Sequence, residues 1–191
     1  MRSYIFALDQ WLCRWQHFYE FTDDPQCLFR IQYLRSDDAL QLTDGTCVRP
    51  GGRVIAVHLW NEHVPLMGCQ GPSLAWARRV DRAVEGSLRA LAGYLAQHPG
   101  LSDVVAICGD MRLSGDEQST QFLRIAARYG FESIGRQVDR RGILHRIGDT
   151  ILIAMLMSAT NARALRRAPL RLTNARVWLS RAMLETYRPM R

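Results

Sequence analysis

The chain has 191 residues, of which 48% are hydrophobic and 23% charged, a balance that fits one globular domain and excludes wholesale disorder. Its 25 basic residues are all arginine, and the net charge is +7. The five cysteines are dispersed and form no C-x-x-C pair, which argues against a structural zinc motif and a secreted disulfide framework.

The first residues contain no apolar core of the kind found in a signal peptide. The longest apolar run, residues 151–157, is much shorter than the about 20 residues that cross a bilayer as a helix. We therefore expect a cytoplasmic protein whose cysteines are free thiols.

The first 60 residues predict one helix and two strands. Apolar side chains at helical spacing predict an amphipathic helix over 4–19. Residues 27–34 then predict a strand. Three turns rich in Gly, Asp and Pro separate it from a second strand at 53–60, which is apolar on both faces, as a central strand should be.

The middle of the chain alternates between helix and strand. Ser73 is a suitable N-cap for a long helix over 73–97, and a short apolar strand is expected at 103–108. Ser114 and Glu117 have the spacing of a capping box, and Gly130 would end the helix that this box begins. The core stripe expected on the first helix is Trp76, Val80, Val84, Leu88, Leu91 and Leu95. The residues expected to face inward on the second are Phe122, Ile125, Ala126 and Tyr129.

A strand at 131–134 and helices over 141–166 and 173–187 complete the expected elements. Strands that alternate with helices predict an α/β (α+β) fold with a central mixed sheet and flanking helices. We expect a single domain over 1–191. Its expected parts are an N-terminal helix at 1–24, a sheet-and-helix core at 25–137 and a basic helical C-terminal part at 138–191.

A polar segment follows the central strand at the position where ligands bind in open α/β sheets. A carboxylate beside a histidine there can serve as a general base, and a neighbouring parallel strand would bring an aspartate to the same edge. The expected catalytic residues are His58, Asn61, Glu62, His63 and Asp110. In the alternative, His58 is a core histidine and Asn61 and Glu62 only fasten the loop. The spacing does not match a metal site.

The loop before the long helix is the candidate anion or cofactor site. Gly68, Gly71 and Ser73 lie where free backbone N–H groups can hold a phosphate. The loop lacks a G-x-x-x-x-G-K-[ST] or G-x-G-x-x-G motif, so the alternative is an ordinary capped loop, and no cofactor is expected from the residues alone.

The C-terminal part is strongly basic. Residues 136–191 carry 12 arginines and three acids, whereas residues 1–135 carry 13 arginines and 15 acids. The arginines expected to contact an anionic partner are Arg163, Arg166, Arg167 and Arg171. An anionic membrane surface or a phosphorylated glycolipid fits them best, and nucleic acid ranks last because no reading motif is present. The alternative is a helix that packs on the core. The oligomeric state is left open.

The stretch from Asp44-Gly45-Thr46 through Pro50-Gly51-Gly52 to Val57-His58-Leu59-Trp60-Asn61-Glu62 resembles the YkoP-like domain family, and Gly130-Phe131 fits its layout. The resemblance covers about residues 25–190. It implies a role in the metabolism of envelope polysaccharide or glycolipid, because such domains accompany polysaccharide deacetylases and glycosyltransferases. It also favours His58 and Asn61 as functional residues.

A second similarity is to GNAT-type N-acetyltransferases. The order of strands and helices, with the segment from Arg124 to Phe131 before the last strand, looks like the C-terminal half of that fold. This similarity implies a transferase that uses acyl-CoA, although the pyrophosphate loop of that family is not matched at 68–73. A non-catalytic binding or scaffold protein with a basic surface is the third possibility.

Overall fold

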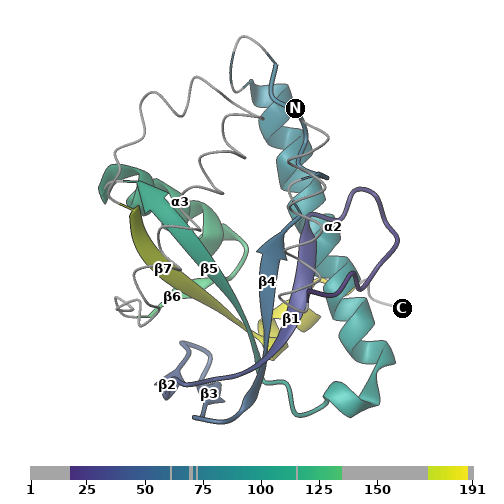
Figure 1. Ribbon diagram of the computed structural model, residues 1–191, viewed down its shortest axis with the longest axis vertical. Coiled ribbons are helices and arrows are strands. Elements are labelled where there is room, and N and C mark those ends of the chain that lie inside the picture. The colour runs from purple at the N-terminus through teal and green to yellow at the C-terminus, as the bar shows by residue number, and fades with distance from the viewer. Residues whose placement is uncertain are drawn as a thin grey trace.

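The computed structural model describes residues 18–60, 62–68, 71, 73–114, 116–134 and 172–188, with no account of the side chains of 111–120 and 172–174. These residues form a mixed α/β fold, as the sequence predicts, around a five-stranded sheet in the order β1-β4-β5-β7-β6 (Figure 1). The sheet strands are β1 (Phe29–Arg35), β4 (Arg53–Leu59), β5 (Ala106–Ser114), β6 (Glu132–Ser133) and β7 (Leu172–Ser180). The helices are α2 (Leu74–Gln97), α3 (Asp116–Arg128) and α5 (Arg181–Glu185), with a 3-10 turn at Pro99–Leu101.

The sheet contains one parallel pair among its described strands. β4 pairs with β5 in parallel, whereas β1 with β4, β5 with β7 and β6 with β7 are antiparallel. The parallel pairing runs only from Val54 and Ala106 to Val57 and Gly109. Beyond these residues β4 and β5 point in different directions, so that the sheet splits at their carboxyl ends (Figure 1).

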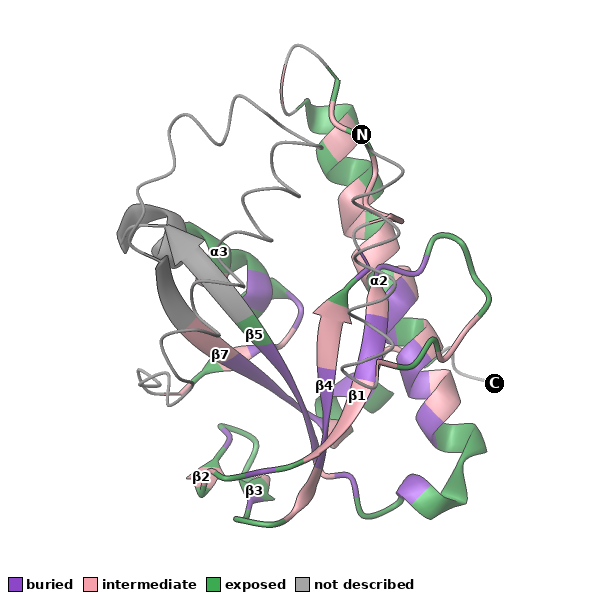
Figure 2. Ribbon diagram, in the orientation of Figure 1, coloured by how far each residue is buried: buried purple, intermediate pink, exposed green. Residues whose placement is uncertain are grey.

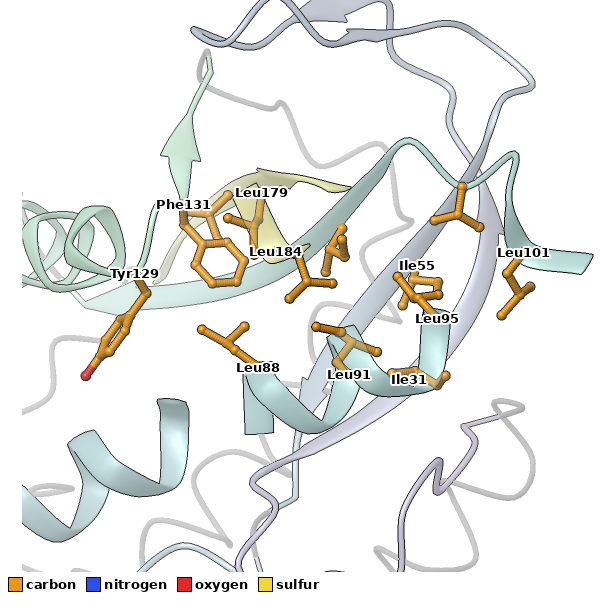
Figure 3. Packing of buried hydrophobic residues seen from close by; sticks show 14 of the residues in the cluster. Ile31, Ile55, Leu88, Leu91, Leu95, Leu101, Tyr129, Phe131, Leu179 and Leu184 are labelled. Carbon is orange, nitrogen blue, oxygen red and sulfur yellow. The ribbon is translucent and has the colours of Figure 1, made fainter. Parts of the chain in front are cut away.

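The main core lies on one face of the sheet, under the helices. Figure 3 shows Leu91 and Leu95 of α2 beside Ile31 and Ile55 of the strands. Leu88 of the same helix lies nearer to Phe131 and Leu184 (Figure 3). The remaining fully or nearly buried members come from α2, β5, β7, α3, α5 and the segments that follow α2 and α3: Ala92, Leu101, Val104, Ile107, Ala126, Tyr129, Phe131, Val177, Leu179 and Leu184. Alternation along each strand sends the intervening side chains to the opposite face.

A two-stranded hairpin covers part of that opposite face. It consists of β2 (Leu40–Gln41) and β3 (Cys47–Val48). Its buried cluster with the sheet contains Leu42, Val48, Val54, Ala56, Ala106, Cys108 and Trp178. The backbone N–H and hydroxyl of Thr43 also donate to Glu132 of β6, at 3.0 and 2.7 Å. The hairpin therefore covers the face beside the first residues of β4 and β5, away from the end where the sheet splits.

Two local signals in the sequence set the ends of helices as predicted. The Ser73 side chain accepts a hydrogen bond from the backbone N–H of Trp76, which caps α2. At the end of α3, Phe131 N–H donates to Ala126 O and Gly130 N–H to Ala127 O, the pair of bonds of a Schellman motif. Gly130 adopts φ +82°, which glycine tolerates and other residues resist.

Other predictions are wrong. Residues 173–180, the first part of the helix expected over 173–187, belong to β7 (Leu172–Ser180), and the helix covers only Arg181–Glu185. Ser114 is the last residue of β5 and the helix begins at Asp116, so Ser114 does not directly precede the first helical residue. Phe122 and Ile125 are about half exposed rather than inward-facing. The helices expected over 4–17 and 141–166 lie outside the described residues, and Tyr19 forms a bridge with Ile31 instead of ending a helix.

Candidate functional site

Four polar side chains follow one another across the sheet, just above the cluster under the hairpin. Arg30 pairs with His58 between β1 and β4, and Asp110 pairs with Arg176 between β5 and β7. The register of β4 and β5, continued by one residue past Val57 and Gly109, matches His58 with Asp110. By alternation all four lie on the same face as Ala56, Cys108 and Trp178. We refer to Arg30, His58, Asp110 and Arg176 as the polar row.

The polar row crosses the point at which the sheet splits. Arg30 and His58 stand on one side of the divergence, and Asp110 and Arg176 stand on the other. A charged row on an otherwise apolar sheet face is costly unless its members are paired or solvated. The ion pairs and hydrogen bonds of these side chains therefore decide which of them can still exchange a proton with a ligand.

Arg30 is the most deeply buried member of the row, with 3% of its surface exposed. Its guanidinium lies 4.5 Å from the ring centre of Trp60, in a cation–π contact. It also forms ion pairs with Glu20, at 3.2 Å, and Glu62, at 3.7 Å. Arg30 thus gathers two carboxylates and one indole ring at the end of β4.

Glu62 is held by two donors on the same oxygen. The Trp60 indole N–H donates to its Oε2 at 3.2 Å, and Arg30 pairs with that same atom. Within the part of the chain that the structure describes, its Oε1 makes no polar contact, and 22% of the side chain is exposed. A carboxylate that is fixed through one oxygen and open at the other is suited to accept a proton from a substrate.

His58 is half-buried beside this group. Its ring lies 4.1 Å from the ring of Phe18, and its Nε2 atom is buried. Phe18 and Glu20 alternate with Tyr19, which pairs with Ile31 at the edge of β1. The segment at 18–20 therefore places one aromatic and one acidic side chain over the β1 end of the polar row.

His63 has a structural environment. Its ring stacks on Trp60 at 3.8 Å, and its Nδ1 is 2.8 Å from the carbonyl oxygen of Cys27. Its backbone N–H donates to the carbonyl of Trp60, which closes a tight turn after β4. These contacts orient the Trp60 ring, whose indole N–H in turn holds Glu62.

Asp110 is committed to an ion pair. Arg176 donates from Nε and Nη2 to both of its carboxylate oxygens, at 2.6 and 2.9 Å, and pairs with Asp38 at 3.5 Å. The hydrogen bond to Asp110 raises the pKa of the Arg176 guanidinium above its ordinary value. A carboxylate bound at both oxygens by arginine is a poor proton acceptor. Burial raises the pKa of the adjacent Cys108 thiol to about 12, so this thiol is not a nucleophile at neutral pH.

The structure brings three of the five expected catalytic residues to one edge of the sheet: His58, Glu62 and, across the split, Asp110. His63 belongs to the packing around Trp60, and Asn61 lies outside the described residues. Within that part of the chain, no group of three or more metal-binding side chains is present.

The other expected sites fall differently. Gly71 has φ +93° and donates to the carbonyl of Gly68, and Ser73 caps α2, which is the geometry of an ordinary capped loop. The C-terminal arginines from Arg163 to Arg171 lie outside the described residues. Among the helices that the structure does describe, none is both long enough and apolar enough to cross a bilayer.

Sequence reasoning missed Arg30 and Arg176. A signal existed for Arg30, because a single charge stands within the apolar run of the predicted strand at 27–34. Arg176 could not be placed, because its segment was expected to be a helix. Both residues became part of the site only through the register of the strands.

Comparison with known proteins gives one match. The family model of the YkoP domain matches residues 2–188, nearly the whole chain. No curated protein and no solved structure matches. The match spans both halves of the polar row and the segments on either side of it, and the chain therefore belongs to the YkoP domain family.

Proposed function

We propose that the protein is an enzyme of envelope polysaccharide or glycolipid metabolism that transfers an acyl group from acyl-CoA at the split between β4 and β5. The observation that carries this proposal is the separation of the one parallel strand pair beyond Val57 and Gly109, with the polar row on both sides. In α/β sheets, ligands bind outside the carboxyl ends of parallel strands.

The strand order supports the choice of acyl transfer over other reactions. A helix connects β4 to the parallel β5, a second helix connects β5 to β6, and β7 inserts between β5 and β6. This is the arrangement expected of a GNAT-type transferase. The family resemblance supports a glycan or a glycolipid as the acceptor. Fold similarity alone does not give function, so the proposal depends on the side chains at the split.

The chemistry assigned to the site is nucleophilic attack on a thioester. A hydroxyl or amine of the acceptor attacks the acyl carbonyl, and a new C–O or C–N bond forms as the C–S bond breaks. Glu62 takes the proton of the acceptor through its open Oε1 and returns it to the departing thiolate. Arg30 and Trp60 keep the other oxygen of Glu62 in place.

Thermal unfolding with ligand present tests the first half of this proposal. Acetyl-CoA and longer acyl-CoAs at about 100 times their Kd should stabilise the native state by about 2.7 kcal/mol, a rise in Tm of roughly 5–10 °C for a chain of this size. ATP at the same concentration is the control for contacts with the adenine nucleotide alone. No rise with any acyl-CoA at millimolar concentration would refute acyl transfer.

Release of free CoA thiol in the presence of amino-sugar or polyol oligosaccharides tests the second half. The thiol should appear only when an acceptor is present, and an acetylated product of the matching mass should accumulate. Binding of acyl-CoA without turnover on any acceptor would leave a binding protein and contradict the assignment of an enzyme.

A further inference from the structure

The first half of α2 contains no fully buried residue, and Val84 near its end is partly buried against the core. Every buried residue of this 24-residue helix lies in its second half: Ser87, Leu88, Leu91, Ala92 and Leu95. Figure 2 shows this change along the helix, because its first turns are exposed or intermediate and the buried positions begin farther along. The first turns of α2 therefore bury little surface against the described part of the fold and leave an outward face that a partner can cover.

The outward face of this segment is basic. The exposed charged residues between Leu74 and Arg89 are four arginines and one acid: Arg78, Arg79, Arg82, Arg89 and Glu85. Asp81, the other acid in this stretch, is partly buried and accepts a hydrogen bond from the Tyr129 hydroxyl. The first turn contains no acid. The exposed side chains of this stretch therefore carry a net positive charge.

Two large aliphatic side chains protrude beside these arginines. Leu66 is 65% exposed and Leu74 is 69% exposed, the highest values among the large hydrophobic residues described. The Trp76 indole N–H donates to the carbonyl of Pro65, which ties the loop carrying Leu66 to the first turn of α2. Leu74, Arg78 and Arg82 follow at intervals of four, so that they lie along one line of the helix.

We propose that the outward face of α2 from Leu74 to Arg82, together with Leu66, docks on an anionic lipid surface. Arginines attract acidic headgroups, and protruding leucines enter the boundary between headgroups and acyl chains. The leucines decide the class of partner, because a nucleic acid would satisfy the arginines and leave both leucines in water. This surface contains none of the arginines expected to bind an anionic partner at 163–171, and the proposal is independent of the proposed acyl transfer.

Co-sedimentation of the full chain with vesicles tests the proposal. Vesicles of phosphatidylglycerol and phosphatidylcholine in a 3:7 ratio should retain the protein at low salt, and pure phosphatidylcholine vesicles should not. Replacing Arg78, Arg79 and Arg82 together by Gln should lower the partition constant on the order of 100-fold, because each arginine near such a surface contributes about fivefold. Leu66→Ser with Leu74→Ser should lower it as well while leaving the charge unchanged.

The matched control replaces three exposed arginines elsewhere, Arg49, Arg124 and Arg188, by Gln, which changes the net charge by the same amount. An equal loss in both triple variants would mean that overall charge binds the membrane and would overturn the proposal. Unchanged binding after the α2 substitutions would overturn it too, as would retention on duplex DNA with no retention on vesicles. All replaced side chains are exposed, and a thermal melt of each variant checks that the fold is kept.

Discussion

Arg30 carries a full charge in a place where almost no water reaches it. Its partners are more exposed than it is, with Glu20 56% and Glu62 22% exposed, so these carboxylates can be solvated if Arg30 is lost. Breaking a fully buried pair costs about 3–5 kcal/mol, and we therefore expect Arg30→Met to lose less, about 1–3 kcal/mol. Urea unfolding measures the loss.

Arg53→Met is the matched control for that measurement. Arg53 pairs with Asp103 at 2.8 Å, but both side chains are exposed, and such pairs contribute about 0–1 kcal/mol. Equal losses in the two variants would mean that the contacts of Arg30 with Trp60 and Glu62 do not stabilise the end of β4.

Glu62 and Asp110 are both acids near the split, but their environments assign them different roles. Glu62→Gln keeps an oxygen for the Trp60 indole and removes the proton acceptor, so turnover of acyl-CoA should fall about 10²–10⁴-fold. Asp110→Asn disturbs the ion pair with Arg176 and should reduce turnover far less. Steady-state kinetics measures the turnover of both variants. A larger loss of turnover in Asp110→Asn than in Glu62→Gln would contradict the assignment of Glu62 as the base.

The Schellman motif is the clearest constraint on a single element. A Cβ at Gly130 would sit 2.7 Å from Met183 Cγ, in a left-handed conformation that costs other residues about 1–2 kcal/mol. Gly130→Ala should therefore destabilise the protein by at least that amount. Gly93→Ala is the control, because it lies inside α2 with nothing within 4 Å and should stabilise by up to about 1 kcal/mol. Chemical denaturation measures the unfolding free energy of both variants. A change of the same sign in the two would contradict this account.

The β2–β3 hairpin depends on pH through Asp44. A hydrogen bond from the Ser180 side chain, and then the backbone N–H of Thr46, lower the pKa of the Asp44 carboxyl below its usual range. Because the pKa is lower in the folded state, this contribution to stability is present above the unfolded pKa of about 3.9 and is lost as the pH falls below it. The difference in unfolding free energy between wild type and Asp44→Asn should thus shrink between pH 6 and pH 3. A constant difference over that range would refute the linkage.

Elements with a local signal could be predicted, and those that depend on distant pairing could not. Ser73 and Gly130 mark helix ends through contacts within a few residues, and both appear as expected. By contrast, β7 forms because its nine residues pair with residues of β5 that lie 58 to 74 positions earlier in the chain. Such pairing overrides the local preference of a segment, because strand propensity depends on the neighbouring strands.

The same limit applies to the candidate site at the scale of the whole molecule. Chain order was enough to expect His58, Glu62 and Asp110 near one edge of the sheet, because carboxyl ends of parallel strands meet. Their unequal availability was not predictable. It depends on Arg30 and Arg176, whose places follow from the registers of β1 and β7.

The central claim of the account is that the split between β4 and β5 receives the acyl donor. Backbone amide ¹H–¹⁵N shifts of the full chain, recorded during a titration with acetyl-CoA, test this claim most directly. We predict that the largest changes occur at Val57–Leu59 and at Gly109 and Asp110, on the two sides of the split, and that they saturate together. Saturable changes confined to other parts of the chain, or no changes at all, would contradict it.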